Sequence, residues 1–169
     1  VTKTQANPPF ERLPGLEGSS YNAHLVSKST MTDTVFVGAN DGHLHAFNAS
    51  TGVEIMSYVP EAIFSELSIL TSPAYDHNFF VDGILNAGDV FINSSWKTIL
   101  VGSLGRGGNT IFALDVSNVD SFSASNVLWE FSDPDMGNFL GKPQLVRLNN
   151  GKWAVIAGNG YNSTNERPE

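Results

Sequence analysis

The chain has 169 residues, 41% of them hydrophobic and none of them cysteine, which excludes a generally disordered protein, disulfides, thiolate metal sites and cysteine nucleophiles. Its 17 acidic and 9 basic residues give a formal charge of −8, which opposes binding to nucleic acid and to anionic membranes. No run of about 18 apolar residues is present and the first residues lack a signal-peptide pattern, so we expect no membrane insertion.

Residues 1–32 are expected to form an opening segment that is loop or extended. Prolines and glycines interrupt any regular pattern in its first part, at Pro8, Pro9, Pro14, Gly15 and Gly18. From residue 33 to residue 169 the chain instead shows short strand-like runs separated by turn residues.

The first predicted hairpin joins Val35–Val37 to His43–Phe47. The connecting turn contains Asn40, Asp41 and Gly42. This turn tolerates positive φ and is the strongest short-range hairpin signal in the chain. A third strand is expected at Val53–Val59, where Val53, Ile55, Ser57 and Val59 alternate with Glu54, Met56 and Tyr58.

A short amphipathic helix is predicted from Pro60 to about Leu70. Pro60 suits the first helical position, and Glu61 places an acid in the first turn. One face of this helix would carry Ile63, Phe64, Leu67 and Leu70. We expect this apolar face to pack on the domain, with binding of a partner as the alternative.

The rest of the chain predicts strands joined by polar loops. The strands are expected at residues 79–81, 87–93, 96–101, 110–116, 127–131, 145–148 and 153–157. Trp129 is expected to be buried, and Asn149, Asn150 and Gly151 are expected to form a hairpin turn.

One block of sequence occurs twice. VFVGANDGHLHAFNASTG at 35–52 and ILVGSLGRGGNTIFALDVSN at 99–118 place Gly38 and Gly102 64 residues apart, and WAVIAGNGYN at 153–162 opens a third copy. Such units bury their apolar faces only against neighbouring units. The predicted fold class is therefore all-β, a partial β-propeller with quinoprotein-like blades of antiparallel strands and a short inserted helix. Residues 33–169 would hold roughly two blades and the start of a third, truncated at the C-terminus.

Two groups of residues are weak candidates for metal binding. Asp133, Asp135 and Asn138 supply oxygen ligands at positions 1, 3 and 6 of a loop, although the EF-hand pattern fails and a solvated turn is the alternative. His43 and His45 would share one strand face. Other ligands for these histidines could come from Asp76, His77 or Asp82. The alternative for His45 is a hydrogen bond between blades.

Structural roles are expected for most of the other polar motifs. Ala46–Gly52 resembles the blade-closing motif of quinoprotein dehydrogenases, with Asn48 in place of its aspartate and Met56 in place of a docking tryptophan. Asp115 is expected to accept backbone N–H bonds in its turn. The residues expected to form turns and blade contacts are Asn40, Asp41, Gly42, His45, Thr51, Gly52, Asp115 and Gly151.

No catalytic motif is present. The glycine-rich loop at Gly105–Asn109 is followed by a predicted strand, whereas nucleotide-binding loops need a following helix. The chain also lacks a Gly-x-Ser-x-Gly elbow. The sequence therefore predicts a protein that is not an enzyme.

Five motifs in order resemble a known family. These are GANDGHLHAFNASTG (38–52), FFVDG (79–83), WKTILVGSLGRGGNTIFALDVSN (96–118), LWEFSD (128–133) and NNGKWAVIAGNGYNS (149–163). They resemble the C-terminal propeller of type IV pilus tip-associated adhesin and biogenesis proteins, the PilY/PilC family. The resemblance covers roughly residues 33–163.

The resemblance implies a bacterial protein exported through the periplasm and displayed at the pilus tip, or fimbrium, on the cell surface. There it would support pilus biogenesis and surface attachment as a non-catalytic platform. The implied partners are minor pilins of the tip complex and host or abiotic surfaces. The family's calcium-binding loop would follow the last motif, beyond this segment, so calcium is assigned to no residue here. The alternatives are a quinoprotein-type dehydrogenase propeller and a generic extracellular scaffold propeller.

Overall fold

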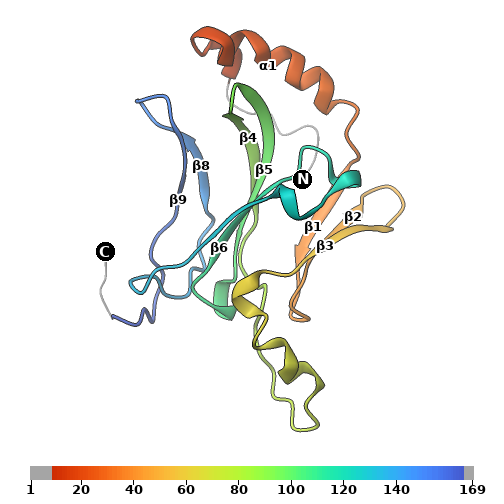
Figure 1. Ribbon diagram of the computed structural model, residues 1–169, viewed down its shortest axis with the longest axis vertical. Coiled ribbons are helices and arrows are strands. Elements are labelled where there is room, and N and C mark those ends of the chain that lie inside the picture. The colour runs from red at the N-terminus through yellow and green to blue at the C-terminus, as the bar shows by residue number, and fades with distance from the viewer. Residues whose placement is uncertain (1–8, 166–169) are drawn as a thin grey trace.

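Three separate antiparallel sheets form the fold in the computed structural model, which describes residues 9–165 (Figure 1). The first sheet contains β1 (Thr34–Gly38), β2 (Leu44–Asn48) and β3 (Glu54–Tyr58). The second contains β4 (Asn86–Ile92), β5 (Ser95–Ser103), β6 (Ile111–Asp115) and β7 (Val127–Phe131), and the third contains β8 (Gln144–Arg147) and β9 (Trp153–Ile156). Consecutive strands are neighbours in every sheet, which is the order of strands in a propeller blade and agrees with the predicted all-β class.

The sequence repeat corresponds to equivalent strands of successive sheets. Gly38 ends β1 and Gly102 lies in β5, and each strand pairs with the next one along the chain. A Cβ atom at Gly38 would lie 2.3 Å from the carbonyl oxygen of Val81, and one at Gly102 would lie 2.5 Å from the ring of Phe112. Glycine therefore occupies this place of the repeat because other parts of the chain pass close to the backbone.

Two apolar clusters form the core between the three sheets. The first contains Leu44, Phe80, Phe112 and Leu114, which lie between the first and second sheets. The second lies between the second and third sheets and contains Val90, Ile99, Val101, Ile111, Ala113 and Met136. Because β6 is buried on both faces, its apolar residues form a continuous run instead of alternating with polar ones.

The prediction of a loop for the opening segment is wrong where the structure describes it. Helix α1 (Gly15–Lys28) follows a short 3₁₀ helix at Phe10–Arg12 and crosses one end of the second sheet (Figure 1). Pro14 is extended and precedes the helix, where a proline does not interrupt its hydrogen bonds. Gly18 lets the helix approach Leu13, whose carbonyl oxygen would be 1.9 Å from a Cβ atom. Pro14 thus precedes the helix, Gly15 is its first residue and Gly18 lies at a close contact, so none of them interrupts it. Residues 1–8 are outside the described part.

The prediction of a single helix from Pro60 to about Leu70 is also wrong. The segment forms two 3₁₀ helices, Glu61–Ile63 and Leu67–Thr71. Ile63 is fully buried, whereas Phe64 is 58% exposed, so the predicted apolar face does not pack as a unit. A continuous helix this short is only marginally stable without such packing.

Most other predicted strands are present with ends shifted by a residue or two. Residues 79–81 are an exception and lie outside the strands. Instead of a strand ladder, they make single hydrogen bonds with the first hairpin, from Phe80 N to Asn40 Oδ1 and from Val81 N to the Ala39 oxygen. Trp129 is 38% exposed and not buried as expected, because β7 is the edge strand of its sheet.

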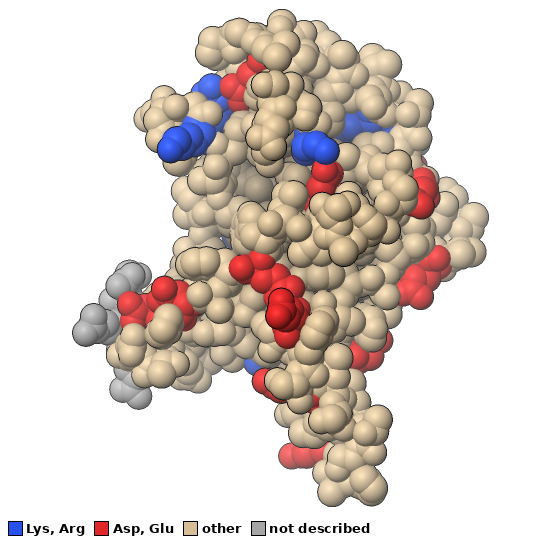
Figure 2. Space-filling view, in the orientation of Figure 1, with Lys and Arg blue, Asp and Glu red and all other residues tan. Residues whose placement is uncertain are grey.

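Among the charged side chains on the face shown in Figure 2, acidic ones are more widespread than basic ones. Acidic side chains are spread over this face, and most basic ones lie in the upper part, near α1 and the β8–β9 hairpin. In residues 9–165, no helix is both long enough and apolar enough to cross a membrane.

Candidate functional site

The turn between β1 and β2 brings three potential metal ligands together. The N–H of Ala39 donates to the oxygen of His43 at 2.9 Å, and Gly42 has a φ of 92° that favours glycine. The N–H of His43 in turn donates to Asp41 Oδ1 at 2.9 Å. This tight turn places Asp41 beside the strand face that carries His43 and His45.

His45 lies between two carboxylates. Its Nδ1 is 2.7 Å from Glu54 Oε1, and its Nε2 is 2.9 Å from Asp41 Oδ2. The hydrogen bond with Glu54 raises the pKa of His45 above its ordinary value, and Asp41 adds to this against the effect of partial burial. Because an ionised carboxylate can only accept a hydrogen bond, both contacts are satisfied together when both ring nitrogens of His45 carry a proton.

His43 completes the cluster. Its ring stacks on that of His45 with 5.4 Å between centroids, and its Nδ1 is 3.5 Å from Asp41 Oδ1. One ligand atom from each of Asp41, His43 and His45 lies within 4.8 Å of the others. Partial burial alone would raise the pKa of Asp41, but the His43 N–H and the His45 ring lower it below its ordinary value.

The additional partner of this cluster is Glu54, which sequence reasoning did not identify. Asp76 and His77 lie in an exposed loop, where the His77 ring packs against Phe79. The N–H of Asp82 donates to the Leu104 oxygen in another part of the fold. Among residues 9–165, the group of three side chains that could hold a metal ion contains none of these candidates.

A β-bulge explains how Glu54 reaches His45. His45 pairs with Ser57, but the register shifts after Ala46 so that Phe47 pairs with Glu54. Without this shift, Ile55 and not Glu54 would share the face of His45, since side chains alternate along a strand. The hydrogen bonds of His45 lie within the first sheet, so the expected bond between blades is wrong.

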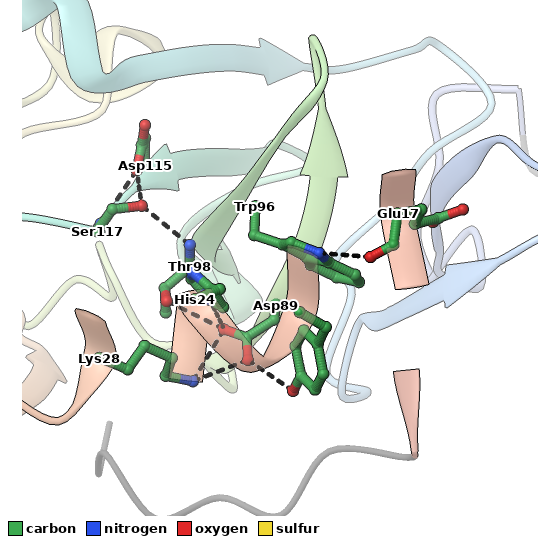
Figure 3. A network of polar contacts seen from close by, with 9 residues as sticks. Glu17, His24, Lys28, Asp89, Trp96, Thr98, Asp115 and Ser117 are labelled. Atoms are coloured by element: carbon green, nitrogen blue, oxygen red, sulfur yellow. Dashed lines mark hydrogen bonds and ion pairs between the residues drawn. The ribbon is translucent and has the colours of Figure 1, made fainter. Parts of the chain in front are cut away.

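A second polar cluster connects α1 to the second sheet (Figure 3). Asp89, on β4, is fully buried and accepts hydrogen bonds from Lys28 Nζ at 2.8 and 2.9 Å and from Tyr21 Oη at 3.1 Å. Thr98 Oγ1 donates to the same carboxylate at 3.0 Å, and His24 Nε2 lies 3.1 Å from it. Burial alone would raise the pKa of Asp89, but His24 and Lys28 outweigh that effect and hold the pKa well below its ordinary value. The carboxylate is therefore ionised at neutral pH.

The start of α1 is connected to both the second and the third sheet. Glu17 accepts hydrogen bonds from Arg147 Nε at 2.9 and 3.0 Å and from Arg147 Nη2 at 2.8 Å. Trp153 Nε1 donates to the Glu17 carboxylate at 2.8 Å, and Trp96 Nε1 donates to its backbone oxygen at 2.9 Å. The contacts with Arg147 lower the pKa of Glu17, with a further contribution from Trp153 and against the effect of burial.

Aromatic rings fill the space around these polar contacts. Phe10 stacks on Trp96 at 5.4 Å and meets Tyr21 and Trp153 edge to face at 5.3 Å. Sequence reasoning did not find this cluster or the ion pairs within it. One signal was present, because Asp89 is the one charged residue of β4 and a buried carboxylate requires a partner.

The expected turn residues form local hydrogen bonds. Asn48 Oδ1 accepts the N–H groups of Ser50 and Thr51, and Thr51 Oγ1 accepts that of Val53. Gly52 and Gly151 have φ angles of 72° and 83° in their turns. Asp115 accepts the N–H of Ser117 at 3.0 Å and pairs with Lys97 at 2.8 Å.

The oxygen-rich loop at Asp133–Asn138 lies against the segment after β9. Asp133 Oδ1 accepts the N–H of Asp135 at 2.9 Å, and Asp135 Oδ1 accepts a hydrogen bond from Asn165. Asn138 Nδ2 donates to the Arg106 oxygen, and the Asn138 backbone pairs with Tyr161. Metal binding by Asp133, Asp135 and Asn138 stays a hypothesis, with a solvated turn as its alternative.

An apolar groove of about 480 Å³ lies beside the edge of the second sheet. It is lined by Ile111, Trp129, Glu130, Phe131, Met136, Val155, Ala157, Gly158 and Asn159. Its acid, Glu130, accepts a hydrogen bond from Tyr58 and others from the N–H groups of Glu61 and Ala62. These bonds connect β7 to the first sheet.

Comparison with known proteins identifies close relatives. A family model described as the PilY1 beta-propeller domain matches residues 13–168. The chain is 47% identical over 160 residues to a "Type IV pilus biogenesis factor PilY1 homolog" of Xylella fastidiosa, covering 92% of this chain and 11% of the relative. It is 44% identical to "Type IV pilus biogenesis factor PilY1" of Pseudomonas aeruginosa over 153 residues, 87% of this chain and 13% of that protein.

A solved structure shares the fold. The crystal structure of the Pseudomonas aeruginosa PilY1 C-terminal domain matches with a TM-score of 0.77 and 38% identity. The match covers 98% of this chain and 32% of that domain. The prediction of a partial β-propeller is confirmed.

Proposed function

The chain belongs to the PilY1 β-propeller family, and we propose that it serves as a non-catalytic platform in type IV pilus biogenesis. The observation that carries this proposal is the 47% identity, over 92% of the chain, to a protein named as a type IV pilus biogenesis factor. The chain spans 11% and 13% of the length of the relatives compared above, so the role belongs to the whole protein of which such a propeller is a part.

The chemistry of the buried carboxylates supports a structural role. Glu17 and Asp89 pair with cations from other elements, and in both cases the pKa is lowered. A general acid or base would instead need a pKa near the working pH. These carboxylates stay ionised at neutral pH and connect α1 to the sheets, which is the arrangement expected of a rigid support.

A projecting segment offers a surface for a partner. Residues 64–79, between the buried Ile63 and Phe80, extend away from the sheets at the bottom of Figure 1. They carry exposed apolar side chains at Phe64, Ile69 and Tyr75. We propose that this segment contacts minor pilins of the tip complex, in a protein exported through the periplasm to the pilus tip. Adhesion to host or abiotic surfaces, with calcium bound elsewhere in the protein, belongs to the same proposal.

Complementation in the native bacterium tests this function. Deletion of the gene is expected to reduce the number of surface pili, and the intact wild-type protein should restore it. A variant with Phe64→Ser, Ile69→Ser and Tyr75→Ser should be exported in normal amounts but restore fewer pili, since its core is unchanged. Asp76→Ser, in the same projecting segment, is the matched control and should restore pili fully. A normal number of pili after deletion would contradict the proposed role in pilus biogenesis. Full restoration by the triple variant would contradict only the proposed contact between the projecting segment and minor pilins.

A further inference from the structure

We propose that Asp41, His43 and His45 bind one divalent transition-metal ion of the zinc class, with Glu54 positioning the ring of His45. The ligands would be the two imidazoles and the Asp41 carboxylate. This site lies on the first sheet, away from the cluster that fixes α1, and goes beyond the proposed role in pilus biogenesis.

The spacing of the ligand atoms suits a single ion. One nitrogen of each histidine and one Asp41 oxygen all lie within 4.8 Å of one another. Two ligands that both bind zinc at about 2 Å lie closer together than that, so only small side-chain rotations are needed. The cluster is also open to solvent, because the His43 and Asp41 side chains are 37% and 54% exposed.

The ligand types select the class of metal. Imidazole nitrogen suits zinc, copper and nickel, whereas calcium and magnesium prefer sets of oxygen atoms. Two nitrogens and one carboxylate are a three-ligand set of the kind that leaves a coordination position of zinc for water or another group. At an exposed hairpin, that position is accessible to a side chain of a partner protein.

The hydrogen bond of Glu54 to His45 is a second feature typical of metal sites. Metal-binding histidines commonly donate the N–H of their second ring nitrogen to a carboxylate, which fixes the ring and its tautomer. His45 has this arrangement, with Nδ1 2.7 Å from Glu54 Oε1 and Nε2 directed at Asp41. An ion between Nε2 and Asp41 would replace the proton that they share, while the bond to Glu54 remains. The bulge after Ala46 is what places Glu54 there.

Isothermal titration of the intact protein with zinc chloride tests the site. The wild-type protein is expected to bind one more zinc ion per chain than His45→Ala or His43→Ala. Glu54→Gln should keep the site but weaken its affinity by about 10- to 100-fold, as removal of such outer partners does. His77→Ala, which removes an exposed histidine outside the cluster, is the control and should bind zinc as the wild type does. Circular dichroism before each titration establishes that the variant is folded.

A spectroscopic readout keeps the test independent of heat signals. Cobalt(II) bound by two imidazoles and a carboxylate in four- or five-coordinate geometry should give visible absorption bands in the wild type, and His43→Ala should lose them. Equal zinc stoichiometry in the wild type and in folded His45→Ala would overturn the proposal. An unchanged affinity in Glu54→Gln would overturn the positioning role of that residue.

Discussion

Lys28 on α1 and Asp89 on β4 form an ion pair, 2.8 Å from Nζ to Oδ1, whose side chains are only 5% and 0% exposed. The two residues are 61 positions apart in the sequence. A buried charge without a partner is strongly destabilising. This ion pair therefore fixes α1 on the second sheet, and the stability of the sheet depends in turn on the helix.

Replacement of Lys28 tests this dependence. Lys28→Met should lower the free energy of unfolding by roughly 3 to 5 kcal/mol, because Asp89 would stay buried without its main cation. Urea titration measures the loss. Lys97→Met breaks the pair with Asp115, in which the lysine side chain is 41% exposed, and should cost less than Lys28→Met. In the double variant Lys28→Met and Asp89→Leu, much of the lost stability should return, and equal costs for the two lysine variants would contradict this account.

Acid should weaken the attachment of α1. The pKa values of Glu17 and Asp89 are lowered in the folded protein from ordinary values of 4.5 and 3.8. The stability that these two carboxylates contribute to the folded state is therefore fully present at pH values above their ordinary pKa. It is lost as the pH falls from there toward the lower pKa values of the folded protein. Comparison of urea midpoints at about pH 7 and about pH 3 should show a smaller loss in Asp89→Asn than in the wild type. An identical loss in both proteins would assign acid sensitivity to other groups.

Glu17→Gln should loosen the link between α1 and the third sheet. The neutral side chain keeps the shape of glutamate but loses the paired bonds from Arg147, which depend on its charge. Hydrogen–deuterium exchange should become faster in Gly15–Lys28 and in the β8–β9 hairpin, with little change in β1–β3. Lys152→Gln, on an exposed residue of the same hairpin, is the control and should leave exchange unchanged.

Alanine at the repeated glycines should destabilise the fold. Gly38→Ala and Gly102→Ala would place a methyl group 2.3 Å from a backbone oxygen and 2.5 Å from an aromatic ring. Each is expected to cost roughly 1 to 3 kcal/mol through overpacking. Gly158→Ala meets no atom closer than 3.9 Å and provides the comparison, measured in the same thermal unfolding series. A loss of unfolding free energy in Gly158→Ala as large as in Gly38→Ala would contradict the packing argument.

Local signals in the sequence were sufficient for much of the fold. The turn at Gly42, the hairpin at Gly151 and the strands of the second sheet follow from residue types that act over a few positions. The spacing of Gly38 and Gly102 then indicated repeated units, and the family resemblance indicated their arrangement. These features could be predicted because each depends on neighbouring residues.

Helix α1 and the candidate metal site depend on contacts that the sequence does not show. Tyr21 meets Asp89 across 68 positions, and Glu17 meets Arg147 across 130, so the helix is stabilised by residues that no local pattern connects to it. Glu54 faces His45 only because of a bulge, which shifts the strand register by one residue. Trp129 looked like a core residue, but it lies on an edge strand beside the apolar groove.

Immunogold electron microscopy of isolated pili, with antibody raised against this segment, tests the central claim most directly. Our account predicts gold label at one end of the pili in the wild type and none after deletion of the gene. Label that stays with the cell envelope while the detached pili remain unlabelled would contradict a platform at the pilus tip.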